Sequence, residues 1–548
     1  MTLKLNKRSI VTTGGTMLQK ADTISALRAG FQWDIPDRYN IGEDVCDRIA
    51  AIRPDAPAII DVAPNLTHIT YSFADLRAMS NRFANVLSDL VQQGDRIAVL
   101  LPQCIQTAVA HIGALKSGCI SIPLFTLFGP DALFHRLKDS GTKVVVTNAE
   151  GAAKLATIRD QLPELAHVLC TSGENSDFGT LCASKPDTFA PVDTAADDPA
   201  FIIYTSGTTG NPKGALHAHR VLLGHLPGVE MSHDFFPQPD DKIWTPADWA
   251  WIGGLLDVLM PALHHGIPVV AHRFAKFNAQ AAAKLMQDHG VRNTFLPPTA
   301  LKMMKSAGIT DLPLRSVASG GETLGAALID WGRDTFGVTI NEFYGQTECN
   351  MIVSSCGAIA DAEPGVMGFP VPGHDVAVLD EKGHPTDGEG AIAVRSPNPV
   401  MFLKYWNNSD ATSDKFVNDW LLTGDRGQQL PCGRIKFIGR DDDVISSAGY
   451  RIGPAEIEDC LIMHPAIRLA GVVGTPDDTR GSIVTAFLAL NEDVTADETL
   501  TKDITAHVKT RLAAYEAPRK IHYIADMPMT TTGKIIRAKL REMAKELP

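Results

Sequence analysis

Residues 204–214, YTSGTTGNPKG, are the stretch of this chain best suited to hold an anion. Glycines let the backbone approach a bound group closely, and consecutive N–H groups can then point toward it. Lys213 adds a positive charge. Further hydroxyl donors come from Thr205, Ser206, Thr208 and Thr209. Together these groups suit a polyphosphate.

The flanking sequence predicts a regular element on each side of this loop. The apolar run FIIY (201–204) predicts a strand, and ALHAHRVLLGHL (215–226) predicts a helix. A Walker A loop is excluded, because Pro212 stands where that motif requires a glycine before its lysine. The alternative is a flexible Gly/Ser/Thr surface linker. The preceding strand, together with the proline and lysine at the end of the loop, favours a phosphate site.

Strands and helices alternate through the N-terminal part of the chain. Short apolar runs predict buried strands, and amphipathic stretches of helical length lie between them. The strands are expected at 96–101, 119–124 and 143–148, and the helices at 105–118 and 132–141. Alternation at this spacing predicts α/β layers with a mostly parallel sheet.

A chain of 548 residues is too long for one compact core, so two or more domains are expected. A Gly/Pro-rich region surrounds two strand-like runs, Val376–Leu379 and Ala391–Arg395, which predicts a small antiparallel β subdomain. The charged stretch GRDDD (439–443) marks a second boundary. The predicted fold class is α/β, with a large N-terminal domain of layered subdomains and a small, mobile α+β C-terminal domain. The predicted bounds are 1–440 and 441–548.

Composition and charge argue against several classes of protein. The formal net charge of −13 disfavours a nucleic-acid binder, which needs a basic surface. Nine cysteines without a CxxC pair indicate reduced thiols rather than a disulfide framework or a zinc site. No apolar run is long enough to span a membrane. We therefore expect a cytoplasmic protein, with the mitochondrial matrix as the alternative because residues 1–20 carry basic residues and no acidic ones.

Five further motifs follow the glycine-rich loop: SGGE (319–322), YGQTE (344–348), LLTGD (421–425), GRDDDVISSAGYRIGPAEIE (439–458) and PMTTTGKIIR (528–537). In this order they resemble the signatures of the adenylate-forming superfamily, which includes acyl-CoA synthetases, adenylation domains of peptide synthetases and luciferases. The segments WDIPDRYN (33–40) and WTPADWAWIGG (244–254) resemble the acetyl-CoA and medium-chain acyl-CoA synthetase branch in particular.

The resemblance implies an AMP-forming acyl-CoA ligase that uses ATP, Mg²⁺ and CoA. Such an enzyme converts a carboxylic acid into an acyl-adenylate with release of pyrophosphate, and then passes the acyl group to the CoA thiol. The intermediate is needed because a carboxylate has no good leaving group, whereas the adenylate offers AMP. Negative charge accumulates around the α-phosphorus during the first step, so cations and hydrogen-bond donors should provide most of the catalysis.

The resemblance also implies which residues hold ATP. Thr347 would contact the α-phosphate, Glu348 would ligate Mg²⁺ and Lys534 would stabilise the developing charge, so these three are the expected catalytic residues. The β- and γ-phosphates would meet Thr205, Ser206, Gly207, Thr208, Thr209, Gly210 and Lys213. The rest of the nucleotide would meet Gly321, Glu322, Glu342, Asp425 and Arg440, with the last two at the ribose.

The second half-reaction would require the C-terminal domain to rotate about a hinge at 441–443, and the matching hinge residue is Asp442. The residues expected to face CoA after this rotation are Ser447, Gly449 and Arg451.

Two positions bear on the size of the acid. Trp251 matches a residue that lines the acyl pocket in medium-chain relatives, while Trp249 is a weaker candidate. Gly345 stands where acetate-specific relatives carry a tryptophan. A small residue there implies an open pocket, so we expect a short- to medium-chain acid longer than acetate.

Two other functions stay open on the sequence alone. One is adenylation followed by transfer to a carrier protein; the other is a non-catalytic nucleotide-binding sensor, against which the presence of Glu348 and Lys534 argues. The expected partners are the small-molecule acid, ATP and CoA. A lysine acyltransferase is a further possible partner, because Pro528 upstream of Lys534 resembles the pattern that such enzymes recognise on acyl-CoA synthetases. Acylation would remove the charge of Lys534.

Overall fold

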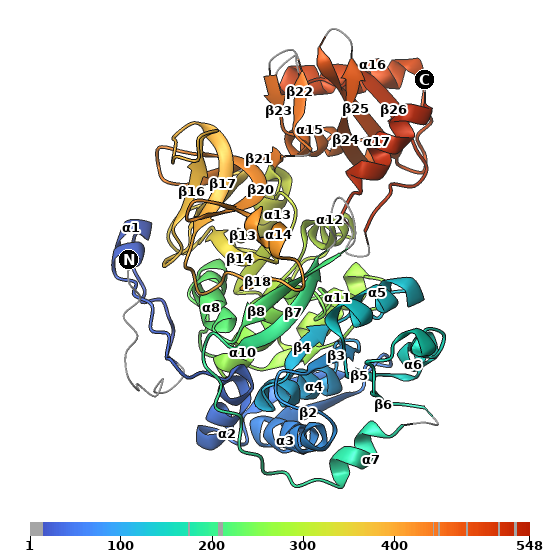
Figure 1. Ribbon diagram of the computed structural model, residues 1–548. Coiled ribbons are helices and arrows are strands. Elements are labelled where there is room, and N and C mark those ends of the chain that lie inside the picture. The colour runs from blue at the N-terminus through green and yellow to red at the C-terminus, as the bar shows by residue number, and fades with distance from the viewer. Residues whose placement is uncertain are drawn as a thin grey trace.

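The computed structural model describes residues 15–547 except 174–175, 206–211, 442, 448–449, 478–479, 513–515 and 531–533. Within these residues, two sheets belong to a large N-terminal domain and a third belongs to a small C-terminal domain (Figure 1). The predicted α/β class with a large first domain and a small second domain is therefore confirmed. The C-terminal domain, red in Figure 1, is seated at one end of the N-terminal domain.

The seven-stranded sheet has the order β18-β8-β7-β4-β3-β5-β6. Strands β7, β4, β3, β5 and β6 are parallel, while β8 and β18 join antiparallel at one edge. The strands and helices predicted between residues 96 and 148 are confirmed, the helices being α4 (Ile105–Lys116) and α5 (Pro130–Ser140). The strands are β3 (Arg96–Leu100), β4 (Ile120–Pro123), β5 (Val144–Thr147), β6 (His167–Cys170), β7 (Pro199–Thr205), β8 (Lys213–Ala218) and β18 (Lys404–Tyr405).

The second sheet has 14 strands and is parallel in one half and antiparallel in the other. Its parallel strands are β1 (Pro57–Val62), β10 (Val269–Ala271), β9 (Ile243–Trp244), β11 (Asn293–Phe295), β12 (Ser316–Gly320) and β13 (Ile340–Gln346). The others are β2 (His68–Ser72), β14 (Cys349–Ser354), β15 (Val366–Pro370), β16 (Val376–Leu379), β17 (Glu389–Arg395), β19 (Phe416–Val417), β20 (Trp420–Gln429) and β21 (Ile435–Arg440). The antiparallel pairing of β16 with β17 was predicted from the turn-rich sequence between them.

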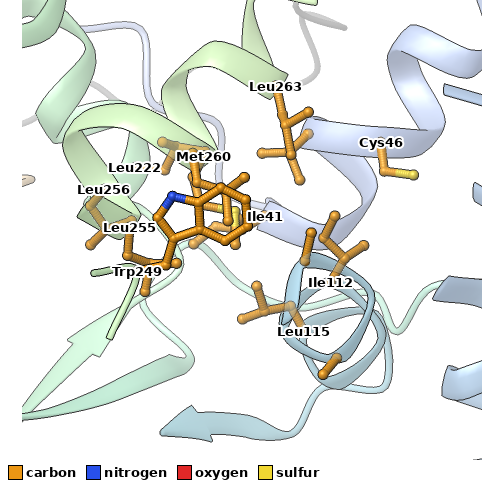
Figure 2. Close-up of a cluster of buried hydrophobic side chains, with 14 of the residues drawn as sticks. Ile41, Cys46, Ile112, Leu115, Leu222, Trp249, Leu255, Leu256, Met260 and Leu263 are labelled. Carbon is orange, nitrogen blue, oxygen red and sulfur yellow. The ribbon is translucent and has the colours of Figure 1, made fainter. Parts of the chain in front are cut away.

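Helices α4, α8 (Val221–Ser232) and α10 (Met260–His264) belong to a hydrophobic cluster that also contains strand residues from both N-terminal sheets. Figure 2 shows Ile112 and Leu115 of α4 on one side of this cluster, with Trp249 and Leu255 on the other. Packing on several sides explains why α4 is largely apolar around its circumference. The remaining elements of this domain are α1 (Ile24–Ala29), η1 (Glu43–Asp47), α2 (Arg48–Ile52), α3 (Phe73–Leu90), α6 (Ala149–Ala156), η2 (Arg159–Gln161), α7 (Phe178–Ala183), α9 (Ile252–Gly254), η3 (Leu255–Leu259), α11 (Ala279–His289), α12 (Pro298–Ser306), α13 (Ala326–Phe336) and α14 (Ser409–Ser413).

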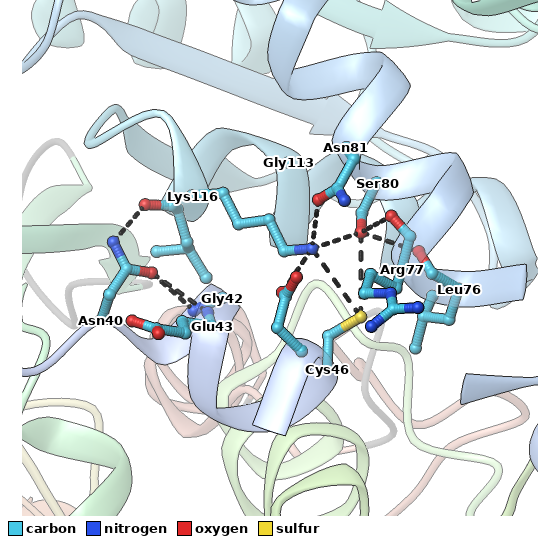
Figure 3. A network of polar contacts seen from close by, with 12 residues as sticks. Asn40, Gly42, Glu43, Cys46, Leu76, Arg77, Ser80, Asn81, Gly113 and Lys116 are labelled. Atoms are coloured by element: carbon cyan, nitrogen blue, oxygen red, sulfur yellow. Dashed lines mark hydrogen bonds and ion pairs between the residues drawn. The ribbon is translucent and has the colours of Figure 1, made fainter. Parts of the chain in front are cut away.

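A buried lysine joins α4 to two neighbouring helical segments. Lys116 Nζ lies 2.5 Å from Asp47 Oδ2 of η1 and donates to Asn81 Oδ1 of α3 at 2.7 Å and to Ser80 Oγ at 3.0 Å (Figure 3). Lys116 is fully buried, and the Asp47 carboxylate together with two hydrogen-bond acceptors compensates its charge. This network ties the end of α4 to η1 and α3.

The C-terminal domain is a compact α+β unit. In helix α15, Ile457 and Leu461 are buried with Val472 of β24, as the one-sided apolar pattern predicts. Its elements are β22 (Ile445–Ser447), β23 (Tyr450–Ile452), α15 (Pro454–Ile462), β24 (Ile467–Asp477), β25 (Gly481–Leu490), α16 (Glu498–Arg511), β26 (Lys520–Tyr523) and α17 (Arg537–Glu546).

The helix predicted at 215–226 is wrong in its first half. Residues Lys213–Ala218 form strand β8, and α8 begins only at Val221. The glycine-rich loop therefore joins two antiparallel strands, β7 and β8, and no helix N-terminus follows it. Ala215 and Leu216 are buried and pair with both β7 and β18, and this tertiary pairing overrides the local helical preference.

All nine cysteines are free thiols, six of them buried, in line with the prediction of reduced cysteines. No helix in the described part of the chain is both long and apolar enough to cross a bilayer.

Candidate active site

Asp425 lies on β20 at the centre of a group of polar side chains. Its Oδ2 accepts a hydrogen bond of 2.6 Å from the Tyr344 hydroxyl of β13, and it pairs across the sheet with Arg440 of β21. Burial raises the pKa of Asp425, while the hydrogen bond from Tyr344 and the positive charge of Arg440 oppose that rise. The structure thus brings the two predicted ribose contacts, Asp425 and Arg440, to adjacent strands.

The YGQTE motif spans the end of β13 and the turn, Thr347 and Glu348, that leads into β14. Gln346 Nε2 donates to the Thr423 carbonyl oxygen at 2.9 Å, which ties this turn to β20. Thr347 is half-buried, whereas Glu348 is buried and accepts a hydrogen bond from the hydroxyl of Tyr405. The motif thus brings the half-buried Thr347 and the buried Glu348 to the same turn.

Lys534 of the C-terminal domain reaches into the N-terminal domain. Its Nζ lies 5.6 Å from the centroid of the Trp251 ring. Gly321, with φ +92°, leaves room for both side chains, because a Cβ there would lie 3.3 Å from Trp251 and 3.5 Å from Lys534 Cε. The two predicted contacts from distant motifs, Gly321 and Lys534, are thus neighbours.

Charges around Lys534 determine its electrostatic environment. Burial lowers the pKa of Lys534, and the Glu322 carboxylate raises it. Arg440 lowers this pKa and Asp425 raises it, both with smaller effects. The backbone holds the residue in place, because Lys534 N donates to Thr530 Oγ1 at 3.0 Å and Thr530 N donates to the Lys534 carbonyl oxygen at 2.7 Å.

Two glutamates belong to the predicted nucleotide contacts: Glu322, in the SGGE segment, and Glu342. Thr299 Oγ1 donates to Glu322 Oε2 at 3.2 Å. Glu342 is buried on β13, where burial raises its pKa to about 8, and Leu324 N donates to it at 3.3 Å. A carboxyl group that carries a proton near neutral pH can donate a hydrogen bond as well as accept one.

The glycine-rich loop is described only at its two ends. Thr205 ends β7 and pairs with Lys213, the first residue of β8, and Lys213 Nζ lies 5.2 Å from the centroid of the Tyr405 ring. Predicted contacts that lie outside the described residues are Ser206, Gly207, Thr208, Thr209 and Gly210.

The predicted CoA contacts lie away from this group. Ser447 is buried at the end of β22, in the hairpin that β22 forms with β23. Arg451 belongs to β23, and Gly449 lies outside the described residues. Figure 1 shows this hairpin at the far side of the C-terminal domain, whereas the segment before α17, which carries Lys534, approaches the N-terminal domain.

The side chains on either side of the predicted hinge contact different domains, although Asp443 N also donates to the Arg440 carbonyl oxygen of β21 at 3.0 Å. Asp441 N donates to the Gly424 carbonyl oxygen of β20 at 3.0 Å, and Asp441 Oδ1 lies 3.5 Å from Arg426 Nη1. Asp443 instead binds two arginines of the C-terminal α17: Arg537 at 3.3 Å and Arg541 at 2.8 Å. The predicted hinge residue, Asp442, stands between these two anchors in sequence and lies outside the described residues.

Two phenylalanine rings follow Trp251 in a chain of aromatic contacts. The Trp251 ring centroid is 5.7 Å from that of Phe295, which is 5.0 Å from that of Phe343. Trp249 is buried in the core cluster instead. At Gly345 a Cβ would meet Met351 N at 2.5 Å and Asn350 Cα at 2.7 Å. The close approach of this backbone is itself a reason for glycine at position 345.

Tyr405 and Lys415 were missed by sequence reasoning. Tyr405 contacts Glu348, and Lys415 Nζ donates to Gln346 Oε1 at 3.2 Å. Both lie in the segment between the β subdomain and the LLTGD motif, where no spacing or charge pattern distinguishes them from ordinary loop residues.

In this two-domain α/β fold, a lysine of the C-terminal domain lies beside Gly321 and near the charges of Glu322 and Asp425. Residues 46–406 match the model of the AMP-binding enzyme family, and residues 456–534 match that of its C-terminal domain. The chain belongs to this family.

Relatives and solved structures agree with this assignment. Human acyl-coenzyme A synthetase ACSM2B, mitochondrial, is 32% identical over 96% of this chain and 94% of its own length. Acetyl-coenzyme A synthetase of Bacillus subtilis is 34% identical over 87% of this chain and 86% of its own length. An acyl-CoA synthetase from Brucella canis matches with TM-score 0.73 and 32% identity over 96% of this chain and 99% of its own. The structure of anthranilate CoA ligase AuaEII in complex with anthranoyl-AMP matches with TM-score 0.85 and 28% identity. The match covers 94% of this chain and 98% of that one. The protein is an AMP-forming acid–thiol ligase of the acyl-CoA synthetase type.

Proposed function

We propose that this enzyme joins a short- to medium-chain carboxylic acid longer than acetate to CoA, through an acyl-adenylate made from ATP. The observation that carries this proposal is the position of Lys534, which a separate domain holds beside Trp251, Gly321 and the charge of Asp425. A cation is placed there at the junction of the predicted nucleotide and acyl sites.

The first half-reaction needs charge stabilisation more than proton transfer. The carboxylate oxygen of the acid attacks the α-phosphorus of ATP, and the bond to pyrophosphate breaks as the negative charge spreads over the phosphate oxygens. Lys534 and the donors of Thr347 would stabilise that charge, while Asp425 would orient the ribose. The depressed pKa of Lys534 reflects its burial; among the nearby charges, Glu322 and Asp425 favour the protonated form and Arg440 opposes it.

Glu348 suits the Mg²⁺ that accompanies ATP. Its carboxylate is buried, and the described residues include no cation paired with it. Mg²⁺ is commonly held by one or two carboxylates together with substrate phosphates, and it would there neutralise phosphate charge as a Lewis acid. Lys213, at the end of the glycine-rich hairpin, would bind the outer phosphates from the other side.

The second half-reaction would use the opposite face of the C-terminal domain. Lys534 must leave, and the hairpin with Ser447 and Arg451 must approach, before the CoA thiol can attack the acyl carbon and release AMP. Because the side chain of Asp441 contacts the large domain and that of Asp443 the small one, the rotation would occur at Asp442. The thiol is nucleophilic enough that no dedicated general base is assigned.

The most direct test of the acyl site is how the reaction rate depends on the chain length of the acid. We expect Gly345→Trp to lower kcat/KM for C4–C8 acids relative to acetate by about 10-fold or more, because the indole would occupy space that a longer chain requires. Rates with acetate, butyrate and octanoate at fixed ATP and CoA measure this ratio.

Gly345→Ala is the matched control, because its Cβ meets the same Met351 backbone without adding a ring. If Trp and Ala change the ratio equally, the effect comes from displaced strands and Gly345 does not limit the pocket.

The function itself is tested by pyrophosphate release from the purified enzyme with ATP and Mg²⁺ against a panel of carboxylic acids, with and without CoA. We expect release that requires the acid, and acyl-CoA formation when CoA is added. Adenylate formation without any thioester would favour the carrier-protein alternative. Nucleotide binding with no acid-dependent release would favour the sensor. Acylation of Lys534 by an acyltransferase and the cytoplasmic location stay predictions.

A further inference from the structure

Glu348 has an unusual environment for a buried carboxylate. Only 6% of the residue is exposed, and its Oε1 accepts a hydrogen bond from the hydroxyl of Tyr405, itself 3% exposed. Within the described ranges, no residue donates to Oε2 and no arginine, lysine or histidine pairs with Glu348. An ionised carboxylate in such surroundings is costly unless a cation joins it.

The pair formed by Tyr39 and Asp44 shows the contrasting arrangement elsewhere in this protein. The Tyr39 hydroxyl donates to Asp44 Oδ2 at 2.7 Å, but Asp44 also contacts Arg48 at 2.6 Å and His264 at 2.6 Å. That carboxylate is compensated within the fold. Glu348 has a tyrosine donor but, among the described residues, no arginine, lysine or histidine beside it, so its second oxygen can accept a charge that arrives with a ligand.

The backbone ties Tyr405 to the strand that leaves the glycine-rich loop. In β18, Tyr405 pairs with Ala215 of β8, and Trp406 N donates to the Gly214 carbonyl oxygen at 2.7 Å. On the other side, Phe402 N donates to the Glu348 carbonyl oxygen at 2.8 Å. The segment 402–406 therefore spans from the β8 strand to the YGQTE turn.

The ring of Tyr405 faces a second charged group. Lys213 Nζ lies 5.2 Å from the ring centroid, within the range of a cation–π contact. The Tyr405 ring thus contacts Lys213, the lysine expected at the outer phosphates. The Tyr405 hydroxyl contacts Glu348, the carboxylate expected at the metal.

We propose that Tyr405 is a positioning residue that orients the Glu348 carboxylate for the divalent cation bound with ATP and sets its distance from Lys213. The inference rests on the proposed function of this site. Hydrogen bonds from such outer partners fix a ligating carboxylate in one orientation, and their loss commonly lowers metal affinity about 10- to 100-fold.

Tyr405→Phe tests the proposal, because it removes the hydroxyl and keeps the ring over Lys213. We expect the Kd for Mn²⁺ in the presence of ATP, measured by the electron paramagnetic resonance signal of free Mn²⁺, to rise about 10-fold or more. The Kd for AMP without metal should stay unchanged, since AMP does not require Glu348. Tyr39→Phe is the matched control and should change neither constant.

Several results would overturn the proposal. An unchanged Kd for Mn²⁺ in Tyr405→Phe means that the hydroxyl does not orient Glu348. An equal rise in the Kd for Mn²⁺ with ATP and in the Kd for AMP means that Tyr405 supports only the fold. Should Tyr405→Phe not fold, Glu348→Gln provides the second variant: it keeps a hydrogen-bond acceptor for Tyr405, so a normal Kd for Mn²⁺ in that protein also refutes the link. Acid-dependent pyrophosphate release by the unaltered enzyme separates these results from failure of the proposed function.

Discussion

Lys534→Ala is expected to lower acid-dependent ATP–pyrophosphate exchange by roughly 10²- to 10³-fold or more, which is the usual loss when a donor to developing charge is removed. Formation of acyl-CoA from preformed acyl-AMP should stay largely intact, because Lys534 faces Trp251 and Gly321 only in the described domain arrangement. Separate assays of the two half-reactions on one protein preparation measure both effects.

Lys539→Ala provides the matched control for that variant. Lys539 lies on α17 close to Lys534 in sequence but is exposed, so its removal should leave both half-reactions near the wild-type rate. Equal loss of both half-reactions in Lys534→Ala would show that the lysine supports the fold or both conformations, and the assignment of Lys534 to adenylation alone would be abandoned.

Glu458→Ala is expected to destabilise the C-terminal domain by about 3 kcal/mol, the cost typical of leaving one partner of a buried ion pair alone. Glu458 Oε2 accepts from Arg537 Nη2 at 2.6 Å, and Oε1 accepts from Val472 N at 2.8 Å. Without Glu458 the Arg537 guanidinium keeps, among the acidic partners that the structure describes, Asp443 at 3.3 Å. For a domain of this size the unfolding midpoint should fall by roughly 10 °C or more.

Differential scanning calorimetry of the full chain, supported by amide hydrogen exchange of α15 and α17, measures this change domain by domain. Glu456→Ala is the control on the same helix: its carboxylate is exposed and lies 3.8 Å from Lys436, a contact that contributes little. A midpoint for Glu458→Ala equal to that of Glu456→Ala would mean that water compensates Arg537 as well as the glutamate does.

Much of the fold follows from patterns that act locally. The strands at 96–100 and 144–147 are short apolar runs bounded by polar residues, and α15 has apolar residues on one face only. Motif order predicted which distant residues would meet, and Lys534, Gly321 and Asp425 do lie in one group. Each of these features depends on spacing along the chain, which a single sequence displays.

The features that sequence reasoning missed depend on packing across the chain. Strand β8 has no alternation of polar and apolar residues because it is covered on both faces, so its pattern resembles a buried helix. The contact of Tyr405 with Glu348 requires β18 to pair with β8, which no local signal indicates. At Gly345 the backbone of Met351 lies where a side chain would begin, a constraint that the residue type alone does not reveal.

The anchors beside Asp442 also limit how the chain between the domains can change in length. Asp441 is tied to β20, and Asp443 is tied to Arg537 and Arg541 of α17. An extra residue inserted between Asp441 and Asp443 would shift the position of the small domain relative to the large one. A deletion would break the contacts of Asp441 or those of Asp443. The linker can therefore rotate, but its length is fixed by the contacts on both sides. It should tolerate a substitution at Asp442 more readily than an insertion or a deletion.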